Sequence, residues 1–295
     1  MVTFDDFAFE IGYNKQILDN YITFADTFYN TFYIAKKAKK KKRIIDSPSK
    51  ELKAVQRWLL KNYFNEIPVS NSANGFIIGR GIKRNAKFHL KKEYLLTVDI
   101  KDFFTSISQK QVFLTLNKTF PDKDLALKLA KVCTFNRRLP QGAPTSPALS
   151  NLVFHEVDDK IINFCKTKSI TYSRYADDLV FSSDSKPGLV EILPFLHSTL
   201  PNHGFKINNS KTKFFSGKGR MAVTGININE GKLTVSKEIK RLLRSQLYNI
   251  IIKEDKATNV NQALGYLSFI KDIEPDYHKK ILEYIDALKV KRDNY

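Results

Sequence analysis

A short acidic segment, Tyr175-Ala176-Asp177-Asp178, sets the strongest limit on how this chain can fold. Residues 171–174 before it and 179–181 after it include aromatic and β-branched side chains, which favour strands. Two strand-forming runs around a tight turn predict a β-hairpin whose tip carries the carboxylates of Asp177 and Asp178. An ordinary acidic hairpin would show the same pattern, so the turn alone does not assign a function.

A second acidic position lies upstream, where the apolar run Leu95-Leu96-Thr97-Val98 leads into Asp99. A strand that ends in Asp, beside a hairpin that ends in Asp-Asp, would bring three carboxylates together. Mg²⁺ binds few protein carboxylates and leaves its other positions to water and substrate phosphate. Two such ions can activate a sugar hydroxyl and neutralise a leaving pyrophosphate. The pattern therefore indicates two Mg²⁺ ions and the chemistry of a nucleotide polymerase.

Another aspartate pair, Asp158-Asp159, has different surroundings. It follows residues 147–157, whose apolar positions have helical spacing. Successive side chains of a helix point about 100° apart. We therefore expect these two carboxylates to diverge and to face water.

The composition indicates a basic protein with a large core. With 295 residues, 42% of them hydrophobic, the chain can form about two compact units. Its 49 Lys and Arg against 30 Asp and Glu give a net charge of +19. This charge favours nucleic acid as the partner, with an anionic membrane surface as the alternative.

Several signals that would place the chain outside the cytoplasm are missing. Cys133 and Cys165 are isolated, which argues against a zinc site or a disulfide framework and fits a reducing compartment. No apolar run reaches about 18 residues, the length that a membrane span needs. Residues 1–10 are acidic and aromatic, unlike a signal peptide. We therefore expect a cytoplasmic protein without a membrane partner.

The first third of the chain has three recognisable segments. Residues 1–35 are aromatic-rich and predicted to be helical, without an assigned role. The basic run at residues 36–43 leads into Ile-Ile-Asp-Ser-Pro, as a basic hairpin would, with a solvated lysine loop as the alternative. Ser49 is placed to cap a helix whose apolar positions are Leu52, Val55, Trp58 and Leu59.

Two later segments have distinct patterns. Residues 139–151 hold three prolines and one glycine, which predicts a stiff loop that can hold the edge of a substrate and then a helix start. From Ser236 the spacing predicts three helices. The first has a basic face that could grip a duplex backbone, formed by Lys237, Lys240, Arg241 and Arg244.

Three of these segments resemble motifs A, B and C of reverse transcriptases, in that order. They are residues 97–104 (Thr-Val-Asp-Ile-Lys-Asp-Phe-Phe), 139–147 (Leu-Pro-Gln-Gly-Ala-Pro-Thr-Ser-Pro) and 175–178. Residues 43–48 resemble the fingers motif and residues 204–212 resemble motif D, so the resemblance covers roughly residues 40–290. Lysines stand where the fingers motif often has a glycine.

Two shorter signatures are similar to markers of bacterial retron reverse transcriptases. One is NAxxH, from Asn85 to His89, and the other is Val223-Thr224-Gly225. The resemblance implies that these residues face the RNA or the edge of the palm. The structural alternatives are a hydrogen-bonded core histidine for His89 and a turn glycine for Gly225.

The resemblance implies an α+β right-hand polymerase fold. Residues 1–94 would be an N-terminal helical extension and fingers. Residues 95–232 would be a palm of antiparallel sheet and helices, with an inserted fingers segment near 110–138, and residues 233–295 a short helical thumb. The implied activity copies part of a structured non-coding RNA into DNA, starting at a guanosine 2′-hydroxyl. The product would be a branched RNA-linked single-stranded DNA (msDNA), and an effector protein in anti-phage defence would be a partner.

The resemblance and the chemistry together assign site roles. We expect Asp99 and Asp177 to bind Mg²⁺ directly, Asp178 to support the site and bind the metal transiently, and the Ile100 carbonyl to be a backbone ligand. Phe104 matches the position that packs against the nucleotide sugar, where a ring would exclude a ribose 2′-hydroxyl and select dNTPs. Three further residues are implied in nucleotide binding: Gln141, Arg43 on the triphosphate and Lys211 on the leaving pyrophosphate.

Two other functions are compatible with the sequence. The protein could be a basic scaffold whose RNA–DNA complex holds a toxic effector silent, or another bacterial reverse transcriptase, from a group II intron or a defence system. Intact Asp99, Asp177 and Asp178 oppose a purely structural scaffold, and the short segment after the thumb opposes an intron maturase. No further acidic constellation indicates a nuclease domain, so removal of the template RNA would need a host enzyme.

Overall fold

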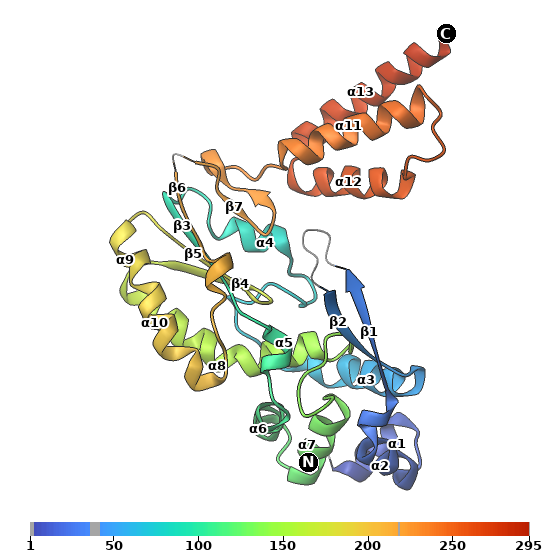
Figure 1. Cartoon of the computed structure of the whole chain (residues 1–295), viewed down its shortest axis with the longest axis vertical. Helices are drawn as coiled ribbons and strands as arrows, with labels where there is room; N and C mark the ends of the chain where they lie inside the picture. The colour runs from blue at the N-terminus through green and yellow to red at the C-terminus, as the bar shows by residue number, and fades with distance from the viewer. Residues whose placement is uncertain (1–2, 36–41, 218, 295) are drawn as a thin grey trace.

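The computed structural model describes residues 3–35, 42–217 and 219–294. Its centre is a four-stranded antiparallel sheet in the order β4-β5-β3-β6 (Figure 1). The strands are β3 (Tyr94–Asp99), β4 (Thr171–Tyr175), β5 (Asp178–Ser183) and β6 (Lys213–Ser216). β4 and β5 form the predicted hairpin, and Ala176 and Asp177 make up its two-residue loop.

The other elements follow the chain around this sheet. Before β3 come α1 (Phe4–Ile11), α2 (Lys15–Thr23), η1 (Ala25–Phe28), β1 (Tyr29–Ala35), β2 (Lys42–Pro48), α3 (Lys50–Asn62), η2 (Phe64–Glu66) and α4 (Ile82–Lys87). Between β3 and β4 come α5 (Phe103–Ser106), α6 (Gln109–Thr119), α7 (Lys123–Val132) and α8 (Ser146–Thr167). After β5 come α9 (Lys186–Val190), α10 (Ile192–Thr199), η3 (Pro201–His203) and η4 (Asn209–Lys211). After β6 come β7 (Ala222–Val223), β8 (Ile226–Asn227), η5 (Asn229–Gly231), α11 (Lys237–Ile251), α12 (Val260–Ile273) and α13 (Pro275–Asp293).

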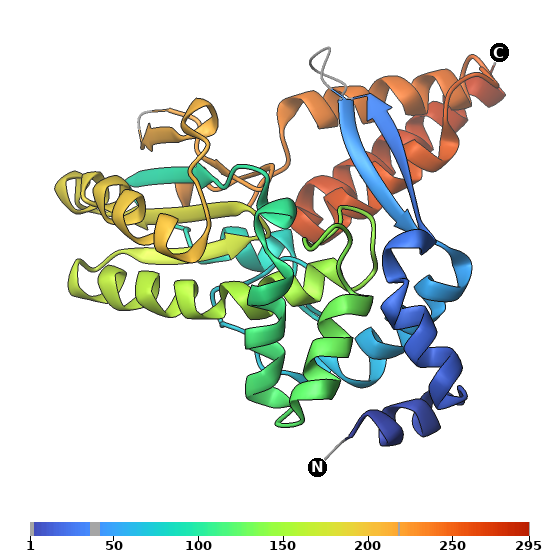
Figure 2. The ribbon, with the colours of Figure 1, turned by 60° about the horizontal axis from the view of Figure 1, so that its bottom comes forward.

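The two faces of the sheet pack against different apolar clusters, because successive strand residues point to opposite sides. Leu96 and Phe181 belong to the larger cluster, which includes the buried side of α8. Figure 2 shows α8 running along that face of the sheet. Leu95 and Val180 belong to the smaller cluster, which includes α4 and the C-terminal helices. The sheet therefore has one face covered by α8 and an opposite face toward α4.

The N-terminal region differs from its prediction. Residues 29–35 form a strand, β1, where a helix was expected, because these aromatic and β-branched residues pair in register with β2. The β1–β2 pairing confirms a hairpin at the basic run, whose residues 36–41 lie outside the described residues. Ser49 caps α3 as predicted, since its Oγ accepts a hydrogen bond from the Leu52 backbone N–H at 3.3 Å.

The C-terminal region is the predicted three-helix bundle. Helices α11, α12 and α13 pack together beyond β7 and β8, away from α1 and α2 (Figure 1). Their apolar faces join the smaller cluster. The larger cluster joins residues on both sides of position 94, and the smaller one joins both sides of position 232, so the predicted domain boundaries stay predictions. Within the described ranges, no helix is long and apolar enough to cross a membrane.

Candidate active site

The three predicted aspartates meet at the end of the central sheet. Asp99, the last residue of β3, lies directly opposite Asp178, the first residue of β5. Residues opposite one another in an antiparallel pair share a face of the sheet. Asp177 lies in the adjoining turn, and its backbone carbonyl accepts a hydrogen bond from the Ile100 N–H at 2.9 Å. The turn is tight because Ala176 adopts a left-handed conformation, with φ of 57°.

Asp177 and Asp178 both have a raised pKa. Burial raises the pKa of Asp177, and the charge of Asp99 adds to this shift. Burial, followed by the charges of Asp177 and Asp99, raises the pKa of Asp178 to about 6. Because Asp178 is exposed to solvent, repulsion by the neighbouring carboxylates is the main cause of its raised pKa. A cluster of this kind favours the binding of a cation.

The Asp99 carboxylate has a partner on each oxygen. The Asn208 side-chain amide donates to Oδ1 at 2.7 Å, and the Lys211 Nζ lies 2.6 Å from Oδ2. The Asn208 backbone N–H also donates to the Asp99 carbonyl at 2.8 Å. The hydrogen bond to Asp99 raises the pKa of Lys211. Asn208 was missed as a site residue, although it lies within the segment that resembles motif D.

The site has the donor chemistry for Mg²⁺. In the arrangement seen across the described residues, no group of three or more His, Cys, Asp or Glu side chains is placed to hold a metal ion. Both oxygens of Asp99 are engaged by Asn208 and Lys211 in this arrangement. Carboxylate oxygens are the ligands that Mg²⁺ prefers, so the three aspartates fit the ion. The Lys211 side chain, which is 61% exposed, has room to leave Asp99.

The predicted sugar-binding ring, Phe104, lies near the ring of Phe76. Phe103 is buried in the core and Phe104 is partly exposed, as expected if only one of the two faces the site. The Phe104 ring centroid lies 6.1 Å from that of Phe76, which lies 6.4 Å from that of Tyr175. Phe76 has φ of 63° and is 47% exposed. Phe76 was not among the site residues predicted from the sequence.

The loop that holds Gln141 lies against the strand that holds Arg43. The Asp46 N–H of β2 donates to the Gln141 carbonyl at 3.0 Å. Gly142 has φ of 145°, and a Cβ there would lie 2.6 Å from the Asp46 carbonyl oxygen, so the close approach requires glycine. The charge of Arg43 acts on Asp177, where it opposes the rise in pKa.

Comparison with known proteins identifies the family. The sequence profile of "Reverse transcriptase (RNA-dependent DNA polymerase)" matches residues 34–270. The chain is 32% identical to the retron Ec86 reverse transcriptase of Escherichia coli, over 90% of this chain and 83% of that protein. It is 34% identical to the Escherichia coli retron Ec73 reverse transcriptase, over 85% of this chain and 86% of the relative. The chain belongs to the retron reverse transcriptases.

Solved structures agree on the fold of this reverse transcriptase. Telomerase of Candida albicans, in complex with a TWJ fragment of telomeric RNA, superposes with a TM-score of 0.54 at 12% identity. The match covers 90% of this chain and 60% of the telomerase. A foamy viral protease-reverse transcriptase matches with a TM-score of 0.50 at 16% identity, over 93% of this chain and 47% of that one. These structures confirm the α+β right-hand polymerase fold. The family profile and the retron relatives show that the chain is an RNA-directed DNA polymerase.

The NAxxH signature of this reverse transcriptase lies inside the protein. Asn85 and His89 are fully buried, so their side chains present no surface to RNA in this structure, and the expected RNA contact stays a prediction. The His89 ring nitrogens lie 2.7 Å from the hydroxyls of Ser182 and Ser173, and burial lowers the pKa of His89 to about 3. Asn85 accepts hydrogen bonds from Ser173 and Asn74. The core-histidine alternative is confirmed, and the signature holds α4 against the sheet.

The second signature packs on the first. Val223 is buried in the smaller cluster, so its side chain cannot contact RNA in this structure. Thr224 and Gly225 form the turn between β7 and β8, with φ of 47° and 85°. Both short strands contact α4. The turn alternative for Gly225 is confirmed, and the predicted RNA contact stays a prediction for the partly exposed Thr224 and the exposed Gly225.

The basic residues of α11 divide into two pairs. Lys237 and Arg241 are exposed, as expected of a surface that binds phosphate. The Lys240 Nζ lies 2.7 Å from Glu274 and 4.1 Å from the centre of the Tyr277 ring. The Arg244 guanidinium lies 4.4 Å from the centre of the Tyr284 ring. Lys240 and Arg244 therefore contact aromatic residues of α13, and of this pair only Arg244 stays exposed.

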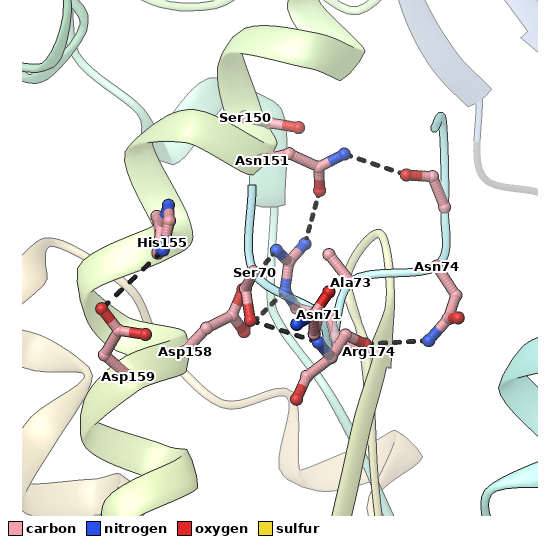
Figure 3. A network of polar contacts seen from close by, with 12 residues as sticks. Ser70, Asn71, Ala73, Asn74, Ser150, Asn151, His155, Asp158, Asp159 and Arg174 are labelled. Atoms are coloured by element: carbon pink, nitrogen blue, oxygen red, sulfur yellow. Dashed lines mark hydrogen bonds and ion pairs between the residues drawn. The ribbon is translucent and has the colours of Figure 1, made fainter. Parts of the chain in front are cut away.

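Asp158 lies in the core, contrary to the prediction that its carboxylate faces water. Helix geometry does point Asp158 and Asp159 in different directions. Asp159 is exposed, and its Oδ2 lies 3.8 Å from His155 Nε2. Asp158, however, is fully buried and pairs with the fully buried Arg174 of β4, at 2.7 Å (Figure 3). The expectation that both carboxylates face water failed because α8 packs against the strand that carries this arginine.

Proposed function

We propose that this reverse transcriptase copies part of a structured non-coding RNA into DNA by two-metal nucleotidyl transfer. The first nucleotide would be joined to a guanosine 2′-hydroxyl, which gives a branched RNA-linked single-stranded DNA (msDNA). The observation that carries the catalytic part is the placement of Asp99 opposite Asp178, with Asp177 next to Asp178 in the β4–β5 turn. The retron relatives support the nature of the template and product.

Asp99 and Asp177 would hold two Mg²⁺ ions, with the Ile100 carbonyl as a further ligand and Asp178 as a supporting charge. When bound, the ions supply charge neutralisation for the attacking hydroxyl and the leaving pyrophosphate. The raised pKa values of Asp177 and Asp178 support this assignment, because a nearby cation would relieve the same repulsion. Catalysis would then consist of positioning and charge stabilisation at the α-phosphate.

The residues around the aspartates would orient the incoming dNTP. Phe104 would close the sugar pocket against a 2′-hydroxyl, and the adjacent Phe76 would form another wall of it. Arg43 would pair with triphosphate oxygens, which its planar guanidinium suits. Gln141 would contact the nucleotide from the loop that lies against β2. Lys211, once released from Asp99, would place its ammonium on the leaving pyrophosphate.

The same proposal names the partners of the enzyme. Lys237, Arg241 and Arg244 are exposed on the α11 basic face and would contact the phosphate backbone of the RNA or its DNA copy. The net charge of +19 supports such binding. An effector protein, a role in anti-phage defence and a cytoplasmic location also belong to the proposal, as the resemblance to retron reverse transcriptases and the sequence composition imply.

The test is the substitution Asp177→Asn, with Asp159→Asn as the matched control. Both remove one carboxylate charge, but Asp159 lies on the exposed side of α8. We expect Asp177→Asn to abolish extension of a DNA primer on an RNA template without loss of thermal stability, and Asp159→Asn to extend normally. An Asp177→Asn enzyme that extends at a near wild-type rate would overturn the two-metal assignment.

A further inference from the structure

A fully buried arginine lies two residues before the catalytic turn. Arg174 donates from Nε to Asp158 Oδ1 at 3.0 Å and from Nη2 to Asp158 Oδ2 at 2.7 Å. The same guanidinium donates from Nη1 to the Ala176 carbonyl at 3.2 Å. Although burial acts to lower the pKa of Arg174, the Asp158 charge raises it, so the side chain stays a cation. Asp158 therefore anchors a donor that reaches the backbone just before Asp177.

A second set of hydrogen bonds links Arg174 to the loop that contains Gly75. Arg174 Nη1 also donates to the Asn151 side-chain carbonyl at 2.9 Å, and Asn151 donates to the Gly75 carbonyl at 2.9 Å (Figure 3). A Cβ at Gly75 would lie 2.8 Å from the Ala176 nitrogen, so this loop lies directly against the turn. The next residue is Phe76, whose ring lies near those of Phe104 and Tyr175.

The backbone of the same arginine is also fixed. The Arg174 N–H donates to the Ser72 carbonyl at 2.8 Å, and the Arg174 carbonyl accepts from the Asn74 N–H at 2.7 Å. The loop of residues 72–75 therefore follows β4 up to the turn. Ala176 is held in a left-handed conformation, which is unfavourable for a residue with a Cβ unless its surroundings fix it.

We infer that Arg174 is a positioning residue of the polymerase reaction. Held by Asp158, it fixes the Ala176 carbonyl directly and the Gly75 carbonyl through Asn151, so that Asp177 and Phe76 keep their places beside the reacting groups. The inference rests on the proposed role of Asp177. An apolar pair of similar volume could fill this space at least as favourably as the ion pair, but it could not donate to the Ala176 carbonyl.

The experiment compares the double substitution Arg174→Met/Asp158→Leu with the control Tyr172→Phe. The double substitution removes both buried charges together, so no unpaired charge is left in the core. Tyr172→Phe removes only a 2.7 Å hydrogen bond to Asp158. For each enzyme we would measure thermal unfolding, kcat and KM for dNTP on an RNA template, and the Mg²⁺ concentration that gives half-maximal rate.

We expect the double variant to fold with a Tm close to that of the wild type. Its kcat should fall about tenfold or more, as misplacement of reacting groups predicts, and its Mg²⁺ requirement should rise severalfold. Tyr172→Phe should change neither. A folded double variant with wild-type kcat and Mg²⁺ requirement would overturn the inference and leave the pair a purely structural role.

A second variant keeps the inference testable if the double variant does not fold. Asn151→Ser leaves the Arg174–Asp158 pair intact and removes the link to Gly75, so the same shifts in kcat and Mg²⁺ requirement are expected at smaller size. An unchanged Asn151→Ser enzyme would then count against the inference. Asp177→Asn, measured in parallel, separates the two proposals. An active Asp177→Asn enzyme refutes the metal assignment, whereas an inactive one beside fully active Arg174 and Asn151 variants refutes only the positioning role.

Discussion

Asp158 and Asp99 are both largely buried carboxylates that accept hydrogen bonds from a basic side chain, but the two basic partners differ in type and exposure. Both side chains of the Arg174–Asp158 pair are fully buried, and the arginine donates two parallel hydrogen bonds to the carboxylate. The Lys211–Asp99 pair joins an enclosed carboxylate to a lysine side chain that is 61% exposed. A bidentate arginine fixes geometry, whereas an exposed ammonium is a mobile point charge. The first pair can therefore hold the catalytic turn, and the second can yield Asp99 to another cation.

Removing only one member of the buried Arg174–Asp158 pair should have the largest effect on stability. Asp158→Ala leaves the Arg174 charge in the core without its partner, which typically costs about 3–5 kcal/mol of unfolding free energy. Chemical denaturation of the variant and the wild type measures the difference. A loss below about 1 kcal/mol would mean that water or another group takes the place of Asp158, and the contrast between the two pairs would disappear.

Breaking the exposed pair should cost far less stability. Lys211→Met keeps most of the side-chain length, and we expect a loss of no more than about 1 kcal/mol, because the lysine is largely solvated. If Lys211 acts as the general acid for the leaving pyrophosphate, kcat should nevertheless fall by about 10²–10⁴-fold. Stability and kcat of Lys211→Met, measured together, distinguish this role from a purely structural one. A variant that loses stability and keeps its kcat would reverse the comparison.

The pH dependence of stability should give the smallest effect. The pKa of Asp178 is about 6 in the folded protein, above its ordinary value, so this group favours the folded state at low pH and that contribution is lost as pH rises through about 6. Without divalent cations, Asp178→Asn should flatten the stability profile between about pH 4 and pH 7, by under about 1 kcal/mol because the carboxylate keeps solvent contact. An identical profile in the variant would show that the aspartates do not repel one another in solution.

The sequence predicts the acidic half of the site well, because the signals there are local. The strand run before Asp99 and the two runs around Asp177 are each read within a few residues, and the sheet brings them into register. The supporting half depends on partners that are distant in the chain. Asp158 meets Arg174 across 16 positions, and His89 finds its two serines more than 80 residues away. Periodicity alone cannot identify such partners.

Two site residues were missed for a related reason. Asn208 contacts Asp99 across 109 positions, and nothing in its own surroundings distinguishes it from a turn asparagine. Phe76 lies near the rings of Phe104 and Tyr175 and has a left-handed backbone, a conformation that aromatic residues rarely adopt. The thumb shows the same limit, since Lys240 pairs with Glu274 on the loop between α12 and α13. Helical spacing predicts that the helix exists but not which of its lysines remain exposed.

The most direct test of this comparison is a crystal structure of the enzyme with an RNA template, a DNA primer, a non-hydrolysable dNTP and Mg²⁺. We expect a cation bound by Asp99 and Asp177, with Lys211 moved from Asp99 toward the triphosphate and the Arg174–Asp158 contacts unchanged. A structure in which Lys211 keeps its contact with Asp99 while the cations bind elsewhere would contradict the account.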